Sequence, residues 1–362
     1  MTGTPGSGTR PRVGLACSED VRRVYIDAAD VARLEAFAEF SYKAFFVASG
    51  LGGPPPPDAR AEAELAGFAS GLDALLVCHG APHVSAAVLE AAPRLSLLGE
   101  LEGDRFAYRL DLEAASRRGV RVVDTSHGSS WPAAEWALGL ALVGLRNAGA
   151  SFRRMIAHEN AFVPVFERSG PGFEKAELSH KRVGLIGFGY IGRRLAELLR
   201  PFQVECRVYD PFVPRALAEP YGVEFGPLET VLKSDVVFVL VPLTAGTEKM
   251  LGAAELDLLD SGCVFVNVSR GKVVDGDALL ARLQRGDIVA CLDVFDPEPL
   301  PADSPLVELT NVFFSPHIAG VTDESRRRFF SLMVDECRRH FDGLEPWSEL
   351  TSGVVRLRTP PS

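Results

Sequence analysis

Three short motifs place an arginine, a glutamate and a histidine behind three successive strand-like runs of the chain. Arg270 lies in V-N-V-S-R-G, Glu298 in D-V-F-D-P-E-P and His317 in S-P-H-I-A-G. A guanidinium holds a planar carboxylate through two parallel hydrogen bonds, and an imidazole moves a proton at neutral pH. A carboxylate beside that imidazole keeps it charged and oriented. These residue types predict a site that binds the carboxylate of a 2-oxo acid and exchanges a proton with it.

A glycine-rich motif upstream supplies the other half of this chemistry. G-F-G-Y-I-G, from Gly187 to Gly192, follows the strand-like K-R-V-G-L-I and begins the helix-like I-G-R-R-L-A-E-L-L-R. Gly187 permits a tight turn, Gly189 lets the backbone approach a pyrophosphate, and Gly192 allows close helix packing. The amides of Tyr190 and Ile191 lie at the positive end of that helix. The motif predicts a dinucleotide cofactor and therefore hydride transfer to the 2-oxo acid.

Two aspartates at strand ends are further candidates for contacts with the cofactor. Asp210 lies 18 positions after Gly192 (210 minus 192), close to the ~20 typical of a carboxylate that binds the ribose. Such a carboxylate repels a 2′-phosphate, which favours NAD over NADP. Arg215 is nearby, but two prolines intervene, and we interpret it as a solvated charge. Asp293 ends a later strand and fits either the nicotinamide amide or a helix N-cap.

The composition favours two globular domains that bind small molecules. At 362 residues and 47% hydrophobic, the chain exceeds the usual size of a single core. A net charge of −10 without a Lys/Arg block argues against a nucleic-acid surface. No run of about 18 apolar residues occurs, so neither a signal peptide nor a membrane span is expected. The scattered cysteines favour free thiols in a reducing cytoplasm; they are Cys17, Cys78, Cys206, Cys263, Cys291 and Cys337.

Apolar runs alternate with helix-like segments along the chain, which is typical of parallel α/β units. Helix-like segments in the N-terminal third include residues 30–40 and 111–118. Strand-like runs there cover residues 13–16, 72–77, 95–98 and 120–123. From Lys181 onward, six more runs are apolar almost throughout, as expected of strands buried on both faces: V-G-L-I-G, C-R-V-Y-D, V-V-F-V-L-V-P, V-F-V-N-V-S, V-A-C-L-D-V and V-F-F-S-P.

These elements predict an α/β protein of two domains. The six runs headed by G-x-G-x-x-G predict a doubly wound parallel-sheet dinucleotide-binding domain over residues 129–321. A long apolar helix over residues 131–147, with Pro132 in its first turn, is expected to connect the domains. A helix over residues 323–341 is expected to carry the chain back to the first domain. We therefore expect a smaller, flavodoxin-like α/β substrate domain that is discontinuous, formed by residues 12–128 and 322–362.

The expected substrate domain offers one histidine at a strand end. His79 lies in C-H-G-A after the strand-like L-D-A-L-L-V, and a single Cys–His pair is too sparse to predict a metal site. Arg105 and Arg109 follow a later strand and would, with His79, receive a second anionic group such as a phosphate. The alternative is that both arginines are solvated among acidic neighbours.

At this point the motifs closely resemble the D-specific 2-hydroxy-acid dehydrogenase family, of the phosphoglycerate dehydrogenase-like kind. The resemblance covers roughly residues 72–322 and is strongest in V-G-L-I-G-F-G-Y-I-G, N-V-S-R-G-K-V-V-D-G-D-A-L, L-D-V-F-D-P-E-P and S-P-H-I-A-G-V-T. It implies NAD as the cofactor, a homodimer formed through the nucleotide domain, and interconversion of a 2-oxo acid with its D-2-hydroxy acid. It also implies that Arg270, Glu298 and His317 are the catalytic residues.

The same resemblance implies further binding residues. Cofactor contacts are implied at Pro242, Thr247, Val268, Ser269 and Gly320, in addition to the glycine motif, Asp210 and Asp293. Substrate contacts are implied at the backbone amides of Cys78, His79, Gly80 and Ala81. Arg105 is a further candidate for a substrate contact, on the basis of its charge alone.

One stretch departs from the family pattern. Where the family usually has G-x-G-x-D-x-I-D, this chain reads G-E-L-E-G-D-R-F-A-Y-R-L-D over residues 99–111. The substrate therefore does not follow from familiar members. Two rival functions remain open: action of the same three residues on a phosphonate, a phosphorylated 2-oxo acid or phosphite, and an NAD-sensing corepressor or scaffold without turnover.

Overall fold

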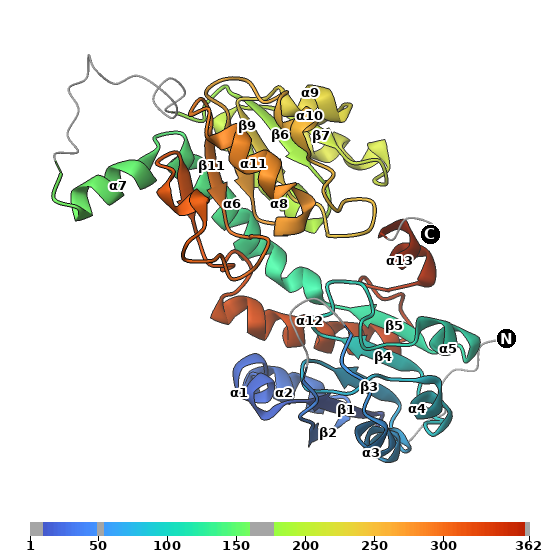
Figure 1. The fold of residues 1–362 in the computed structure, drawn as a ribbon. Helices are drawn as coiled ribbons and strands as arrows, with labels where there is room; N and C mark the ends of the chain where they lie inside the picture. Colours follow the sequence, from blue (N-terminus) through green and yellow to red (C-terminus); the bar gives the residue numbers. More distant parts are fainter. Residues whose placement is uncertain (1–9, 49–53, 160–176, 359–362) are drawn as a thin grey trace. The chain divides into compact units, whose positions relative to one another are not determined.

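The chain contains two compact units, each built on a parallel β-sheet (Figure 1). The computed structural model describes residues 10–48, 54–159 and 177–358. Unit 1 combines the residues up to Ser129 with Thr322–Leu357, and unit 2 contains Ser130–Val321. Within the described ranges, no helix is both long and apolar enough to cross a membrane. The predicted α/β class is confirmed, whereas the ligand of each unit stays a prediction.

Unit 1 has a five-stranded sheet in the order β2-β1-β3-β4-β5, with every neighbouring pair parallel. Its strands are β1 (Arg12–Cys17), β2 (Glu39–Ala44), β3 (Ala74–Val77), β4 (Leu97–Glu100) and β5 (Arg121–Asp124). Its helices are α1 (Glu19–Tyr25), α2 (Ala28–Glu35), α3 (Ala59–Ala69), α4 (Ala86–Glu90), α5 (Leu112–Arg117), η1 (Ser126–Ser129), α12 (Asp323–Phe341) and α13 (Ser352–Arg358).

The helix expected over residues 30–40 is shorter than predicted. α2 ends at Glu35, and the chain then forms β2 at the edge of the sheet. The sequence of β2, E-F-S-Y-K-A, begins with alternating exposed and half-buried side chains. Because an edge strand is not buried on both faces, it lacks the continuous apolar run by which the central strands are found.

The C-terminal part of unit 1 packs on the N-terminal part. Thr322 caps α12 by accepting a hydrogen bond from the Ser325 amide. Three large side chains of α12 are buried in the same cluster as β1, β3 and β4: Phe329, Phe330 and Met333. Farther along, Glu349 forms an antiparallel bridge with Val123 of β5. No sequence pattern indicates this last pairing.

Unit 2 has a seven-stranded parallel sheet in the order β12-β11-β10-β9-β6-β7-β8. Its strands are β6 (Arg182–Ile186), β7 (Glu205–Tyr209), β8 (Glu224–Phe225), β9 (Val236–Val239), β10 (Val264–Asn267), β11 (Val289–Leu292) and β12 (Val312–Phe314). Its α-helices are α6 (Ser130–Gly144), α7 (Ala148–Ile156), α8 (Tyr190–Leu199), α9 (Leu228–Leu232), α10 (Ala253–Leu256) and α11 (Gly276–Leu283). All six predicted runs form strands, and β8 adds a two-residue edge strand.

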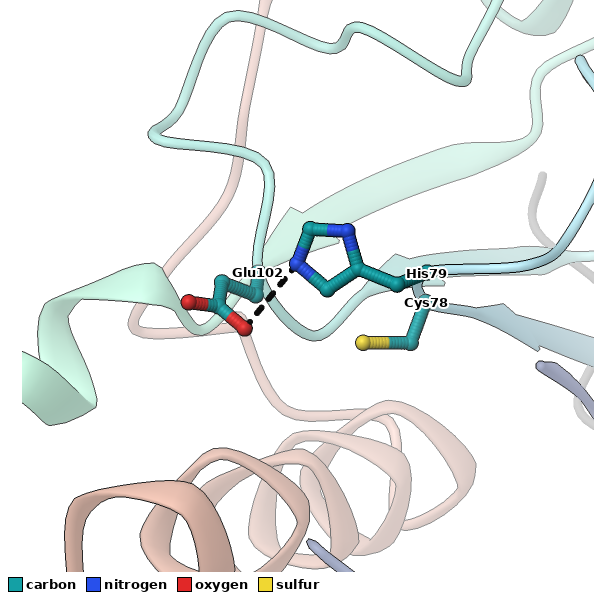
Figure 2. Close-up of side chains that lie close together, drawn as sticks. All are labelled: Cys78, His79 and Glu102. Carbon is teal, nitrogen blue, oxygen red and sulfur yellow. Dashed lines mark hydrogen bonds and ion pairs between the residues drawn. The ribbon is translucent and has the colours of Figure 1, made fainter. Parts of the chain in front are cut away.

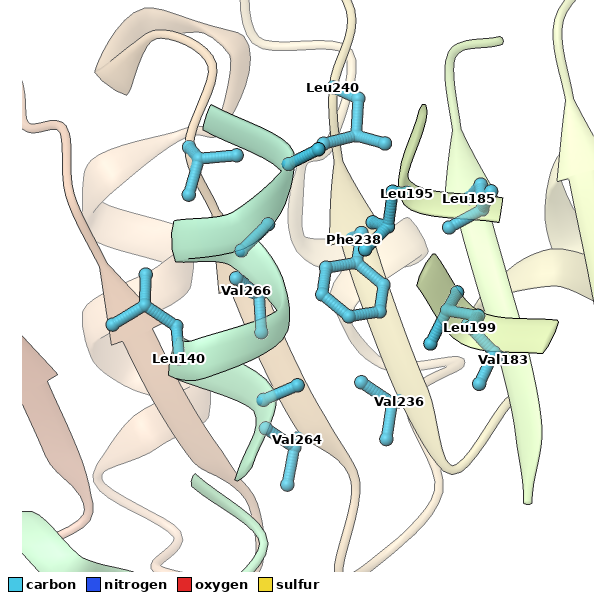
Figure 3. Packing of buried hydrophobic residues seen from close by; sticks show 14 of the residues in the cluster. Leu140, Val183, Leu185, Leu195, Leu199, Val236, Phe238, Leu240, Val264 and Val266 are labelled. Atoms are coloured by element: carbon cyan, nitrogen blue, oxygen red, sulfur yellow. The ribbon is translucent and has the colours of Figure 1, made fainter. Parts of the chain in front are cut away.

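Both faces of the central strands of unit 2 are covered, which explains their apolar sequences. On one face, Leu140 of α6 and Leu195 and Leu199 of α8 pack against side chains such as Phe238 and Val264 (Figure 3). Gly144 allows α6 to approach β10, because a Cβ at Gly144 would lie 2.5 Å from Val264 Cγ1. The helix expected to connect the two domains thus packs within unit 2. A second cluster of buried side chains covers the opposite face.

Candidate active site

A histidine and a glutamate form a hydrogen-bonded pair beyond the carboxyl ends of β11 and β12. His317 Nδ1 lies 2.5 Å from Glu298 Oε1. Both side chains are about one third exposed, at 29% and 31%. Because Nδ1 is held by the carboxylate, Nε2 is the ring nitrogen that can exchange a proton with a reacting group. This pairing of an imidazole with a carboxylate is the arrangement that general acid–base catalysis requires.

Asp293 positions the histidine loop. Asp293 is fully buried, and the contact with the nicotinamide amide that the sequence predicts for it stays a prediction. Its carboxylate accepts hydrogen bonds from the Ser315 hydroxyl and from the amides of Ile318 and Ala319, at 2.5, 3.1 and 2.9 Å. His317 itself has a left-handed φ of 53°. The buried carboxylate therefore holds the backbone on both sides of this unusual conformation.

Two side chains that the sequence did not indicate extend this support. The Trp136 indole donates to Ser315 Oγ at 3.0 Å, and Ser315 donates to Asp293. Trp136 belongs to α6 and Ser315 to the loop after β12. These residues are 179 positions apart, so no local motif reveals the contact.

Arg270 follows β10, the strand next to β11, and a turn organised by Asn267 positions it. Asn267 Oδ1 accepts from both the amide and the hydroxyl of Ser269, and Asn267 Nδ2 donates to the Arg270 carbonyl at 3.3 Å. A Cβ at Gly271 would lie 1.9 Å from the Phe295 carbonyl oxygen. The loop that carries Arg270 thus contacts the loop between β11 and Glu298, at one edge of the sheet. Asn267 was missed, although an asparagine before a turn is a recognisable signal.

The glycine motif forms the turn between β6 and α8 that was predicted for it. Gly187 has a φ of +103°, which L side chains rarely adopt, and a Cβ at Gly192 would lie 2.5 Å from the Gly187 carbonyl oxygen. Gly189 is the N-cap of α8 and has open space where a Cβ would be. The amides of Tyr190 and Ile191 begin this ten-residue helix. An open cradle at a helix N-terminus fits the pyrophosphate of a dinucleotide.

Asp210 lies beside this turn. Its Oδ2 accepts from the Phe188 amide at 2.8 Å, and its Oδ1 accepts from the amides of Phe212 and Val213 at 3.0 and 3.1 Å. Since a carboxylate offers about four acceptor positions, capacity for a ribose hydroxyl remains. A cavity of about 630 Å³ adjoins Asp210 and is lined by residues 209–215 and 225–227. The local geometry fits the predicted ribose site.

The remaining predicted cofactor residues have structural roles of their own. Thr247 Oγ1 accepts from the Thr244 amide and donates to the Pro242 carbonyl, so its hydroxyl closes the loop after β9. Val268 and Ser269 are nearly buried, at 6% and 7% exposure. Gly320 follows the histidine loop. Cofactor contacts at these positions stay predictions.

Several residues of the substrate set predicted in unit 1 form hydrogen bonds within that unit. The Cys78 amide donates to the Ala16 carbonyl and the Ala81 amide to the Cys78 carbonyl, so neither is directed at a ligand. Arg105 is 7% exposed, and its guanidinium donates to the carbonyls of Asp124, Ser348 and Glu349. These bonds anchor the C-terminal segment, and the role of Arg105 at the substrate stays a prediction. His79 and Gly80 remain candidates.

The comparisons with known proteins agree with this geometry. Residues 138–319 match the model of the D-isomer specific 2-hydroxyacid dehydrogenase NAD-binding domain. A glyoxylate reductase of Korarchaeum cryptofilum is 32% identical over 282 residues, which cover 76% of this chain and 82% of that protein. The chain belongs to the D-isomer specific 2-hydroxyacid dehydrogenase family. The predicted family and its NAD-binding Rossmann-type domain are thereby confirmed, and unit 2 contains that domain.

Other members of the family show how much of the chain is shared. A D-3-phosphoglycerate dehydrogenase of Methanocaldococcus jannaschii is 31% identical over 290 residues, which cover 79% of this chain and 52% of that protein. The chain thus spans about half the length of this relative. The crystal structure of a phosphoglycerate oxidoreductase from Rhizobium etli superposes with a TM-score of 0.77 at 28% identity, covering 94% of this chain and 98% of that one. The family fold therefore extends over both units.

Proposed function

We propose that this protein is an NAD-dependent oxidoreductase that interconverts a 2-oxo acid and its D-2-hydroxy acid. The observation that carries the proposal is the His317–Glu298 pair, 2.5 Å apart, at the same sheet edge as Arg270 and the glycine turn. Open parallel sheets bind ligands at the carboxyl ends of their strands. Membership of the family supports the same reaction.

Each of the three residues has a distinct role in the proposed reaction. Arg270 binds the substrate carboxylate through its planar fork and polarises the neighbouring keto oxygen. His317 Nε2 gives a proton to that oxygen during reduction and removes it during oxidation. Glu298 holds Nδ1 of the imidazole and fixes the orientation of the ring. Bound NADH supplies the hydride. The glycine turn and Asp210 hold the cofactor's pyrophosphate and ribose.

Substitution of Glu298 by glutamine is expected to lower kcat for reduction by about tenfold. Glutamine keeps a hydrogen-bond acceptor beside His317 Nδ1, but the hydrogen bond to a charged carboxylate, which is about twice as strong as a neutral one, is lost. The imidazole is then held less firmly in its orientation. Steady-state kinetics of both proteins checks this. An unchanged kcat would remove Glu298 from the mechanism.

NADH absorbance tests the proposed function. The purified protein is mixed with NADH and a panel of 2-oxo acids with small, branched, aromatic, dicarboxylic and phosphorylated side chains. We expect consumption of NADH with at least one acid and a clear preference for NADH over NADPH, because Asp210 repels a 2′-phosphate. NADH binding without consumption for every acid would instead support a sensing role.

We also propose that two copies of the chain associate through α7. Phe152, Met155 and Ile156 are 63%, 67% and 62% exposed, and their spacing places them on one stripe of this helix. Exposed apolar stripes of this kind mark protein–protein contacts. Light scattering should give twice the chain mass of 39.0 kDa, and Phe152→Ser combined with Ile156→Ser should give the single mass. A monomeric parent protein would contradict this proposal.

The state of the cysteines supports a reducing compartment, which we propose to be the cytoplasm. All six are free thiols, and five are buried. Burial raises the pKa of Cys17, Cys206 and Cys291 to about 12, an effect to which Glu19 adds at Cys17. These thiols are therefore unreactive and serve as small apolar side chains.

A further inference from the structure

The imidazole of His317 is held by a side chain at one nitrogen only. Nδ1 lies 2.5 Å from Glu298 Oε1, and within the described part of the chain Nε2 has no hydrogen-bond partner. The position of the ring therefore depends also on the backbone that carries it. That backbone has a left-handed φ of 53° at His317, a conformation that residues other than glycine keep only where the surroundings hold it. The groups that hold this loop thus determine where Nε2 lies.

A histidine of unit 1 shows the opposite arrangement. His79 Nε2 lies 3.1 Å from Glu102 Oε2, and Figure 2 shows the ring pointing at that oxygen. Arg109 donates to the other nitrogen, Nδ1, at 2.7 Å. Both ring nitrogens of His79 are thus bonded to side chains, which fix the imidazole by themselves. The ring of His317 lacks the second of these contacts, and its orientation is correspondingly more sensitive to its loop.

A chain of hydrogen bonds with one direction leads from α6 to the loop of His317. The Trp136 indole lies 3.0 Å from Ser315 Oγ, and Ser315 Oγ lies 2.5 Å from Asp293 Oδ1. An indole N–H can only donate, so the Ser315 oxygen accepts from it, and the single hydroxyl proton is given to Asp293. The Asp293 carboxylate accepts in turn from the two amides that follow His317. The orientation of the Ser315 hydroxyl is therefore set by Trp136.

Trp136 ties this chain of hydrogen bonds to a firmly packed element. α6 packs against β10 and β11, and the Trp136 ring packs on the buried cluster that also contains Ala319 of the histidine loop. Ser315 is 5% exposed and Asp293 is fully buried. Hydrogen bonds in such a buried network are stronger than in water, and each bond strengthens the next. The loop of His317 is thus held from α6, a helix that carries none of the three predicted catalytic residues.

We propose that Trp136 is a positioning residue for the reaction and acts on His317 through Ser315 and Asp293. Its N–H keeps the Ser315 hydroxyl directed at Asp293, and the carboxylate then holds the backbone that aims Nε2 at the keto oxygen. This role requires no contact of Trp136 with substrate or cofactor. The proposal rests on the proposed function, in which His317 gives a proton to that oxygen.

Removal of the indole donor is expected to lower kcat for 2-oxo acid reduction by about three- to tenfold, the effect of one hydrogen bond. Trp136→Phe removes the N–H and part of the ring. Benzothienylalanine at position 136 removes the N–H alone, because a sulfur replaces it in a ring of the same shape, and it should give a similar decrease. KM for the acid and the dissociation constant of NADH should stay within about twofold, since Arg270 and the glycine turn belong to other loops. Trp347→Phe, at a tryptophan 67% exposed in unit 1, is the control and should keep wild-type kcat.

Combined variants show whether Trp136 acts through the proposed chain. Residues that act as a unit have effects that do not add. In a protein that already carries Ser315→Ala or His317→Asn, Trp136→Phe should therefore lower the remaining rate no further. A decrease by the same factor in these proteins as in the wild type would show that Trp136 supports the fold independently of His317, and the proposal would be wrong. A loss of kcat and of NADH affinity together with a lower unfolding temperature would lead to the same conclusion.

An NMR measurement separates this proposal from the proposed function, because it requires no turnover. The ring signals of ¹³C-labelled His317, assigned with His317→Asn, should shift in the protein with benzothienylalanine at position 136. Those of His180, an exposed histidine of unit 2, should not. Unchanged His317 signals would overturn the proposal even in an active enzyme. Shifted signals in a protein that reduces no 2-oxo acid would support the positioning by Trp136 and overturn the proposed function.

Discussion

His317→Asn is expected to lower kcat for 2-oxo acid reduction by about 10²–10⁴-fold, the usual contribution of a general acid. Asparagine tolerates the left-handed φ of 53° at this position, so the backbone of the loop and its hydrogen bonds to Asp293 are retained. The amide cannot exchange a proton at neutral pH. The dissociation constant of NADH should stay within about twofold, because the glycine turn and Asp210 are distant in sequence and belong to other loops.

Steady-state kinetics and NADH fluorescence titration check this expectation together. His180→Asn is the matched control, because His180 also has a positive φ, 59°, and belongs to the same unit. The control should retain wild-type kcat. If His317→Asn also retained the wild-type kcat, the proton would come from another group. That result would contradict the catalytic role proposed for the His317–Glu298 pair.

Arg270→Lys is expected to raise KM for the 2-oxo acid by about 10–100-fold and to lower kcat as well. Lysine keeps the positive charge but replaces a planar, two-pronged donor with a single ammonium group. The loss corresponds to one hydrogen bond between charged groups, about 1.5–3 kcal/mol. The decrease in kcat follows because the keto oxygen is then less well polarised and oriented.

Initial rates across a range of substrate concentrations separate the two parameters. Arg285→Lys serves as the control, since Arg285 is a half-exposed arginine of unit 2 paired with Asp257. Unchanged KM and kcat in Arg270→Lys would show that the substrate carboxylate is bound elsewhere.

The sequence was sufficient for features that depend on local pattern. The six apolar runs after Lys181 form central strands because each is buried on both faces, and a continuous apolar sequence reports that burial directly. The edge strands β2 and β8 were missed because neither contains a continuous apolar run. β2 has the mixed sequence E-F-S-Y-K-A, and β8 has two residues. Arg270, Glu298 and His317 were found because each follows a strand, and parallel strands end at one edge of the sheet.

The structural roles that the sequence did not predict depend on contacts between distant positions. Asp293, which is predicted to contact the nicotinamide, bonds to groups 22 to 26 positions away in the histidine loop. Arg105, which is predicted to contact the substrate, bonds to the Ser348 carbonyl 243 positions away. Charged residues in a loop look alike in sequence whether they bind a ligand or the protein's own backbone. The tertiary fold alone distinguishes these two cases.

The most direct test of the proposed reaction follows the hydride. The protein is incubated with NADH deuterated at both C4 positions and with the best 2-oxo acid of the panel, and the product is examined by mass spectrometry and chiral chromatography. We expect a D-2-hydroxy acid with one deuterium at C2. Product without deuterium, or of the opposite configuration, would contradict it.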